Sequence, residues 1–208
     1  MRSRHAWVAL LFVAVACSRP APAPEATATT SASAPPRAQP GPADAVVEPS
    51  LAPLAGEWLV PLGEDLGFVA PPVGSTEPRP VVVAVHGAGD RPDWSCSEWR
   101  AIFGPAPFIV CPRGAPMGRA FVWHSADALR AAIARATSAL RDAYPGRVLA
   151  APRVYAGFSQ GAALGASIVE GAPSDFAYAV FLEGLGDVEA PTFTRAFHAR
   201  GGKRIVLA

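Results

Sequence analysis

The sequence lacks an excess of either charge and lacks a long apolar run. Its 18 basic and 17 acidic residues leave a net charge of +1 over 208 residues. That balance gives no electrostatic reason to expect nucleic acid or an acidic surface as a partner. The apolar run at residues 6–16 reaches roughly 16 Å as a helix, about half of a bilayer core. A membrane-spanning helix is therefore not expected there.

The N-terminus has the features of an export signal. Arg2 and Arg4 precede the apolar run, which ends directly before Cys17, as in secretory signal peptides. The run and Cys17 resemble the lipobox of bacterial lipoproteins, although Ala14 stands where Leu is commoner. The resemblance implies a signal peptide at residues 1–16, palmitate-type lipid on Cys17, and anchoring to a bacterial membrane facing the periplasm or cell surface. The alternative is ordinary secretion with an incidental cysteine.

Residues 17–55 are predicted to form the lipidated cysteine and a disordered tether. Between positions 19 and 55 there are 9 prolines and 11 alanines, and such a composition cannot build a core. We expect a semi-extended spacer there. Residues 56–208 remain, which is enough for one folded domain.

The folded part alternates between strand and helix patterns. Short runs without a polar face predict buried strands, and three- to four-residue spacing predicts helices. The predicted strands are 81–85, 108–111, 153–156, 176–182 and 204–208, and the predicted helices lie within 125–144, 160–170 and 192–199. This order predicts an α/β fold with a mostly parallel, doubly wound sheet and helices on both faces.

Residues 157–161 form the pattern G-x-S-x-G between a predicted strand and a predicted helix. In a nucleophile elbow, Gly157 and Gly161 let the two backbones approach, and Ser159 stands exposed at the tip. Ser159 is therefore the candidate catalytic nucleophile. The plainer interpretation is a glycine-rich turn with a capping serine.

The loop after the strand at 81–85 offers a second motif, His86-Gly87-Ala88-Gly89-Asp90. Negative charge that develops on a substrate oxygen needs fixed hydrogen-bond donors, and the backbone N–H groups of Ala88 and Gln160 are the candidates for this oxyanion hole. His86 and Gly87 are expected to support the loop. The alternative is an ordinary turn with an incidental histidine.

These motifs resemble the α/β-hydrolase superfamily, especially its phospholipase/carboxylesterase and dienelactone-hydrolase branches. The resemblance rests on residues 85–90, 111–114, Trp123 and 157–161, and covers positions 81–208. It implies hydrolysis of a small acyl ester or thioester through an acyl-enzyme, with no metal and no cofactor. Ala162 departs from the second glycine that many relatives have there.

In that family the acid and then the histidine follow the serine. After Ser159 the only histidine is His198, which lies in a predicted helix, and the acids nearby are Glu183 and Asp187. His124 precedes the serine and breaks the order. We therefore expect a partial hydrolase domain, C-terminally incomplete, that lacks its acid, general base and last elements.

Two further groups complete the prediction. Cys96 and Cys111 either form a disulfide across a loop of roughly 15 residues or stay as free thiols. Aromatic residues in predicted loops form an acyl pocket or lid, or only pack: Trp94, Trp99, Phe121 and Trp123. Arginines in the same loops give weak support for a charge-selective site: Arg91, Arg113 and Arg119.

Two other functions stay open. A serine peptidase of the prolyl-oligopeptidase type uses the same serine motif. A non-catalytic, hydrolase-fold lipoprotein that binds a ligand or partner would need neither the acid nor the base. The oligomeric state is not predicted.

Overall fold

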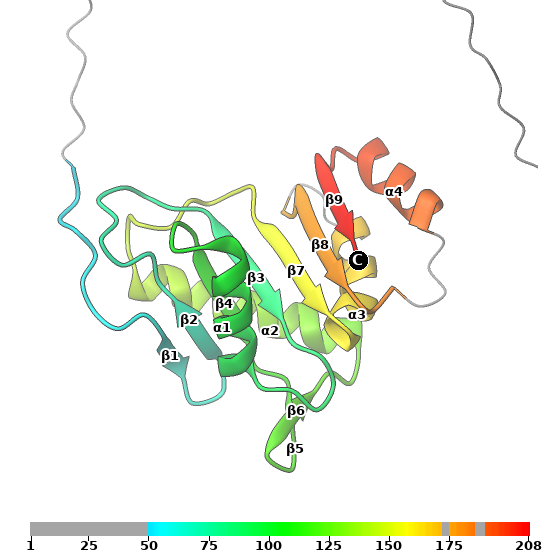
Figure 1. Ribbon diagram of the computed structural model, residues 1–208, viewed down its shortest axis with the longest axis horizontal. Helices are drawn as coiled ribbons and strands as arrows, with labels where there is room; N and C mark the ends of the chain where they lie inside the picture. Colours follow the sequence, from blue (N-terminus) through cyan, green and yellow to red (C-terminus); the bar gives the residue numbers. More distant parts are fainter. Residues whose placement is uncertain (1–49, 172–174, 186–189) are drawn as a thin grey trace, which may run out of the picture. The chain divides into compact units, whose positions relative to one another are not determined.

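The computed structural model describes residues 50–171, 175–185 and 190–208. It has a seven-stranded sheet in which β1 and β2 are antiparallel and the other five strands are parallel (Figure 1). In spatial order the strands are β1 (Val60–Gly63), β2 (Gly67–Ala70), β4 (Phe108–Pro112), β3 (Val81–Val85), β7 (Val154–Phe158), β8 (Tyr178–Leu182) and β9 (Arg204–Leu207). The predicted α/β class and mostly parallel sheet are confirmed.

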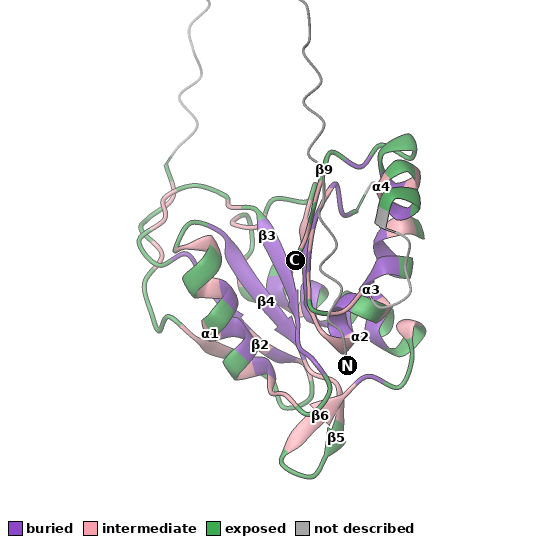
Figure 2. Ribbon diagram, turned by 45° about the vertical axis from the view of Figure 1, so that its right-hand side comes forward, coloured by how far each residue is buried: buried purple, intermediate pink, exposed green. Residues whose placement is uncertain are grey.

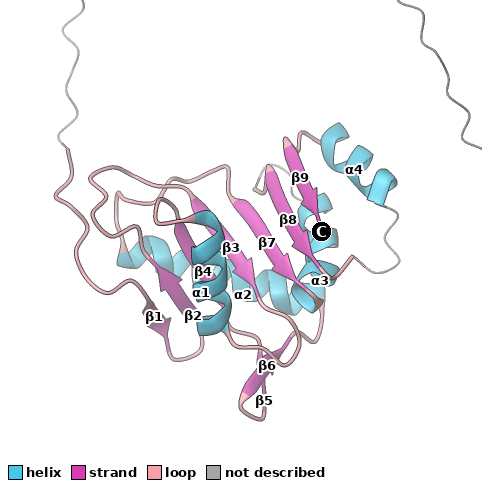
Figure 3. Ribbon diagram, viewed as in Figure 1, coloured by secondary structure: helices cyan, strands magenta, loops and turns pink. Residues whose placement is uncertain are grey.

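Helices cover both faces of the sheet (Figure 3). Helix α1 packs on β2, β3 and β4, while α2 and α3 pack on the opposite face. Helix α4 packs against α3 and β9. The helices in the described part of the chain are α1 (Pro92–Phe103), α2 (Ala126–Ala143), α3 (Gln160–Gly171) and α4 (Ala190–Ala199).

The core consists of two clusters, one on each face of the sheet. Strand β3 contributes to both, because alternate side chains of a strand point to opposite faces. Val83 and Val85 join the cluster under α2 and α3, whereas Val82 and Ala84 join the cluster under α1. All five β3 residues are buried, and Figure 2 shows the central strands as the most buried part of the sheet.

Helix α1 corrects the prediction that Trp94 and Trp99 lie in a loop. Pro92 stands at the start of the helix, where its fixed φ suits a helix and its missing N–H costs nothing. Cys96 and Trp99 are buried against the sheet. The apolar positions of α1 are few, so its stability comes from this tertiary contact, which the local sequence pattern does not reveal.

The antiparallel strands and a short hairpin were also not predicted. The hairpin consists of β5 (Ala115–Met117) and β6 (Ala120–Val122). These segments, like β1 and β2, have only three or four residues each, too few to show a clear two-residue alternation.

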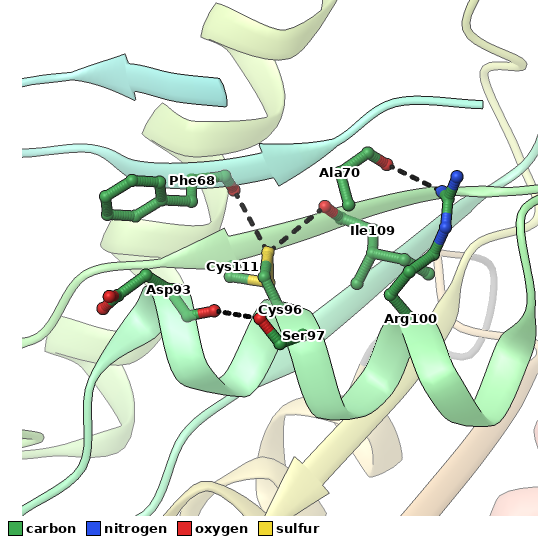
Figure 4. Close-up of a disulfide and its surroundings, with 8 residues drawn as sticks. All are labelled: Phe68, Ala70, Asp93, Cys96, Ser97, Arg100, Ile109 and Cys111. Atoms are coloured by element: carbon green, nitrogen blue, oxygen red, sulfur yellow. Dashed lines mark hydrogen bonds between the residues drawn. A yellow bond between two sulfur atoms is a disulfide. The ribbon is translucent and has the colours of Figure 1, made fainter. Parts of the chain in front are cut away.

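Of the two alternatives for Cys96 and Cys111, the structure has the disulfide, with an S–S distance of 2.07 Å (Figure 4). The bridge joins α1 to β4, and not a loop to a strand. The sulfur of Cys96 lies 3.6 Å from the carbonyl oxygen of Ile109, inside the cluster under α1.

The folded part begins before Gly56, so the predicted boundary of the tether at Ala55 is too late. Leu51 and Leu54 donate backbone hydrogen bonds to Thr76 and Ser75, and Leu54 packs against the core. The physical reason is that these two leucines provide large apolar side chains, which are scarce in the preceding proline- and alanine-rich stretch.

The predicted signal peptide, Cys17 and most of the tether lie outside the described residues. Within the described ranges, no helix combines the length and the apolar character needed to cross a membrane.

Candidate active site

Ser159 forms the turn between β7 and α3. Its φ of 49° lies in the left-handed region, which costs a residue other than glycine about 1–3 kcal/mol and is often found at functional sites. Its N–H donates to the carbonyl of Leu182 at 2.9 Å, and its carbonyl accepts from the N–H of Ala163 at 2.9 Å. The residue is half-buried, and its Oγ forms no hydrogen bond within the described part of the chain. The turn therefore holds a hydroxyl that is free to interact with a ligand.

Glycines make this sharp turn sterically feasible. A Cβ on Gly157 would lie 2.8 Å from the carbonyl oxygen of Gly161, and a Cβ on Gly161 would lie 2.6 Å from that of Val85. A Cβ on Gly184 would overlap the carbonyl of Ser159. The close approach of strand and helix that the G-x-S-x-G pattern predicts is present in the structure.

Tyr155 lies on β7 and connects this strand to the first turn of α3. Its hydroxyl donates to the carbonyl of Gly161 at 2.6 Å, and its ring is fully buried. Burial raises the pKa of the Tyr155 hydroxyl, so it remains a neutral donor.

The two candidate oxyanion donors lie in segments that adjoin Ser159. Gln160 is the first residue of α3, so its N–H has no intrahelical acceptor. Ala88 is exposed in the β3 loop (residues 86–90), and its N–H has no acceptor among the described residues. A Cβ on Gly87 would lie 3.2 Å from the Cβ of Ser159, which places the β3 loop against the serine.

His86 is a buried support of the β3 loop. Its Nδ1–H donates to the carbonyl of Gly87 at 2.7 Å, and its Nε2 accepts from the N–H of Gly114 at 3.3 Å. The ring stacks on Trp123 with 4.6 Å between centroids. Burial lowers the pKa of His86, against smaller opposing effects of the Gly87 carbonyl and Asp90. A neutral imidazole with both nitrogens occupied has no free nitrogen to take the proton of Ser159.

The side chain of Gln160 is a contact that the sequence did not predict. Its Nε2 donates to the carbonyl of Trp123, and its Oε1 accepts from the N–H of the same residue, both at 2.9 Å. The indole Nε1–H of Trp123 donates to the carbonyl of His86 at 2.9 Å. One continuous network therefore links α3 to the β3 loop. Trp123 was singled out in the sequence, but nothing in its spacing indicated Gln160 as its partner.

The remaining candidates for acid and base lie apart. His198 is at the end of α4, and its Nδ1–H donates to the carbonyl of Gly202 at 2.8 Å, just before β9. Ser159 follows the end of β7. Because β7, β8 and β9 are parallel, the start of β9 lies at the opposite end of these strands from Ser159. This topology does not support a pairing of His198 with an acid at Ser159.

Glu183 lies at the same end of the parallel strands as Ser159, because it follows β8 directly. It is exposed, with φ of 53°, and its N–H donates to the carbonyl of Ala208 at 2.8 Å. Asp187 lies outside the described residues, and His124 is exposed before α2. The Oγ of Ser159 forms no hydrogen bond to a histidine or acid in the described ranges.

The four aromatic residues do not gather into one pocket, contrary to one of the two interpretations. Trp94 is 59% exposed, whereas Trp99, five positions along the same helix, is buried. Phe121 and Trp123 line two different cavities. The reason is that these side chains come from a helix and a hairpin that face different neighbours.

The arginines give little support to a charge-selective site. Arg91 pairs with Asp93 and Arg113 with Asp65, each at 2.8 Å, so their charges are compensated. Arg119 is exposed at the turn of the hairpin. Among the described residues, no group of His, Cys, Asp and Glu side chains is arranged to hold a metal ion.

Comparisons with known proteins add only a distant resemblance. No family model matches the chain, and no curated protein matches it significantly. A crystal structure of a protein of unknown function from Agrobacterium tumefaciens is similar, with 19% sequence identity and a TM-score of 0.44. That match covers 63% of this chain and 81% of the other.

Proposed function

We propose that this protein is a serine-dependent carboxylic ester hydrolase with an α/β-hydrolase fold. The observation that carries the proposal is Ser159 in a left-handed backbone conformation between a buried parallel strand and a helix. This is the context that a nucleophile elbow requires. The substrate class is a small acyl ester, and the chemistry uses no metal or cofactor.

In the proposed reaction the Oγ of Ser159 attacks the acyl carbon, and the carbonyl oxygen of the substrate becomes negatively charged. The N–H groups of Ala88 and Gln160 donate to that oxygen, since neither N–H is used within the described fold. The bond to the alcohol then breaks and leaves an acyl-enzyme, which water hydrolyses. Ser159 gives up its proton in the first step, and a base must accept it.

The network through Gln160 and Trp123 supports this arrangement. It connects the helix that carries one N–H donor to the loop that carries the other. Donors that are fixed before the reaction stabilise a developing charge without reorganisation. The buried, neutral His86 contributes by holding the loop.

A fluorophosphonate probe followed by intact-mass measurement tests the proposal. We expect one adduct on the wild-type protein and none on Ser159→Ala. Ser167→Ala is the matched control, because Ser167 is an exposed serine on the same helix, with its hydroxyl donating to Leu164. An adduct that persists in Ser159→Ala, or an unlabelled wild-type protein, would contradict the proposed nucleophile.

A non-catalytic, ligand-binding protein of the same fold is the second candidate. It is favoured by the positions of two histidines. Both ring nitrogens of His86 form hydrogen bonds, and His198 lies near the start of β9, at the opposite end of the parallel strands from Ser159. Absence of probe labelling together with measurable binding of an uncharged ligand would support this candidate over the enzyme.

Lipid anchoring through Cys17 is part of the proposal for the cellular location, facing the periplasm or cell surface of a bacterium. The supporting observation is the sequence pattern directly before Cys17. Metabolic labelling with a palmitate analogue tests it. Incorporation into the wild-type protein and loss in Cys17→Ala is the expected result, and equal labelling of both would contradict it.

A further inference from the structure

A cavity of about 250 Å³ lies between α1 and the carboxyl ends of β7 and β8. Its apolar lining consists of Trp99 and Ile102 on α1 together with Phe158 and Leu182 at the strand ends. Trp99 is buried, whereas Ile102 is 60% exposed and forms the outer part of the lining. At about 30 Å³ for each water-sized atom, the cavity has room for roughly eight non-hydrogen atoms.

The cavity adjoins the proposed nucleophile. Phe158 directly precedes Ser159, and the carbonyl of Leu182 accepts the N–H of Ser159 at 2.9 Å. The β3 loop forms the neighbouring wall, because a Cβ on Gly87 would lie 3.2 Å from the ring of Phe158. A group attached to an ester carbonyl at Ser159 therefore has an apolar space beside it.

Polar groups in the lining restrict what this space can hold. The carboxylates of Asp90 and Glu98 are part of it, and they disfavour a negatively charged ligand. Ser95 also lines the cavity, is only 4% exposed, and has an Oγ with no hydrogen-bond partner among the described residues. A buried hydroxyl without a partner destabilises a fold, so its presence beside a cavity points to a ligand atom that would complete the hydrogen bond.

We infer that this cavity binds the acyl chain of the substrate, and that the chain is short, has no negative charge and carries an oxygen that accepts a hydrogen bond from Ser95. This inference rests on the proposed function, because it assumes that the ester carbonyl lies at Ser159. It adds the substrate class: esters of short alkoxy- or oxo-acids, in preference to plain fatty acids.

The test compares p-nitrophenyl hexanoate with three analogues in which an ether oxygen replaces the methylene at carbon 3, 4 or 5. Each kcat/KM is divided by the rate of alkaline hydrolysis of the same ester, which removes intrinsic differences in reactivity. We expect one analogue to exceed hexanoate by about two- to tenfold, the value of one hydrogen bond. In Ser95→Ala this ratio should fall to about one.

Ser97→Ala is the matched control for the ether series. Ser97 lies on the same helix, outside the cavity, and its hydroxyl donates to the carbonyl of Asp93 at 3.1 Å. The ratio should be unchanged in this variant. No preferred oxygen position in the wild-type protein, or a preference that survives in Ser95→Ala, would overturn the role of Ser95.

A second variant tests the location of the acyl chain. Ile102→Trp narrows the cavity and should lower kcat/KM for hexanoate relative to acetate by about tenfold. Leu149→Trp is the control, because Leu149 is 44% exposed and lies outside the cavity. Equal effects of the two substitutions would exclude this cavity as the acyl site.

Binding without chemistry separates failure of this inference from failure of the proposed function. N-methyl amides of the same acyl chains are uncharged, and saturation-transfer NMR reports their binding to Ser159→Ala. Weaker binding after adding Ser95→Ala or Ile102→Trp supports the cavity even if the fluorophosphonate probe leaves Ser159 unlabelled. Binding that neither substitution changes overturns the inference even if Ser159 is labelled.

The thermal stability of Ser95→Ala distinguishes a ligand-binding hydroxyl from a structural one. Removing an unpaired buried hydroxyl should leave the melting temperature of the free protein unchanged or higher. A clear fall in the melting temperature would show that the hydroxyl stabilises the fold itself and would count against its role toward a ligand.

Discussion

The turns after β3 and β7 are braced by side chains, whereas the turn after β8 and the end of β9 are joined by backbone hydrogen bonds. At the first pair, His86, Trp123 and Gln160 connect three separate segments. At the second, Glu183 donates to Ala208, and Ala208 donates to Phe181. Strand β3 is buried throughout, while β9 alternates between exposed and half-buried residues.

The two regions also contain the two residues other than glycine that have a positive φ within the described ranges, Ser159 and Glu183. Ser159 is packed between glycines, and side-chain hydrogen bonds join Gly161 to Tyr155 and Gln160 to Trp123 directly after it, whereas Glu183 is exposed. A strained backbone position can present a side chain with a fixed geometry only where the surrounding structure is rigid. The region formed by the turns after β3 and β7 is therefore the better candidate for a catalytic site.

Removing the disulfide between α1 and β4 is expected to have the largest effect on stability. The variant Cys96→Ala/Cys111→Ala should lose about 3 kcal/mol of unfolding free energy, because the bridge closes a loop with a sequence separation of 15. Val206→Ala on the exposed side of β9 should change it by less than about 0.5 kcal/mol. Urea unfolding of both variants measures the difference, and equal losses would remove the contrast between the two regions.

Two glycines of helix α3, Gly161 and Gly171, differ in how closely other atoms approach them. Gly161→Ala should cost about 2 kcal/mol, since its Cβ would meet the carbonyl oxygens of Val85 and His86. Gly171→Ala has no atom within 4 Å of its Cβ and should be neutral or slightly stabilising. Melting temperatures report the difference. A tolerated Gly161→Ala would show that α3 does not approach β3 as closely as described.

The hydrogen bond from the Trp123 indole to the His86 carbonyl is expected to make a smaller contribution to stability. Trp123→Phe keeps an aromatic ring stacked on His86 but leaves the His86 carbonyl without its donor, so we expect a loss of about 1–2 kcal/mol. Trp58→Phe is the control, because Trp58 is 50% exposed. Denaturant unfolding of the two variants decides whether the network contributes to stability.

The smallest expected effect is a pH dependence that originates in His86. Because burial lowers its pKa below the ordinary value of 6.5, the unfolded chain takes up a proton there before the folded chain does. Stability should therefore fall as the pH drops through 6.5, by at most about 1.4 kcal/mol per pH unit. Unfolding measured between pH 7.5 and 5.5 should show a shallower slope for His86→Asn.

His124→Asn is the control for this pH series, because His124 is exposed. Its slope should match that of the wild-type protein. If His86→Asn keeps the full slope, the imidazole is not held neutral by burial, and the interpretation of His86 as a neutral support of the β3 loop is wrong.

The sequence indicated most of the parallel sheet but missed one helix and the short antiparallel strands. Val81–Val85 and Phe108–Pro112 are continuous apolar runs, so their burial on both faces follows from composition alone. Helix α2 shows a clear helical period over 18 residues. Helix α1 has no such signal, because its buried face consists of Pro92, Ser95, Cys96 and Trp99 and becomes apparent only against the sheet.

The features of the candidate site also divide into those that the sequence predicted and those that only the folded structure reveals. By itself the sequence determined the serine, the two glycines beside it and the position of the motif between strand and helix, because all of these depend on residues adjacent in the chain. The tertiary structure decided that Gln160 pairs with Trp123, that His86 is occupied on both nitrogens and that His198 lies at the opposite end of the parallel strands from Ser159. The contacts of Gln160 with Trp123 and of His86 with Gly114 join residues tens of positions apart, and local spacing carries no information about which distant backbone atom a side chain will reach.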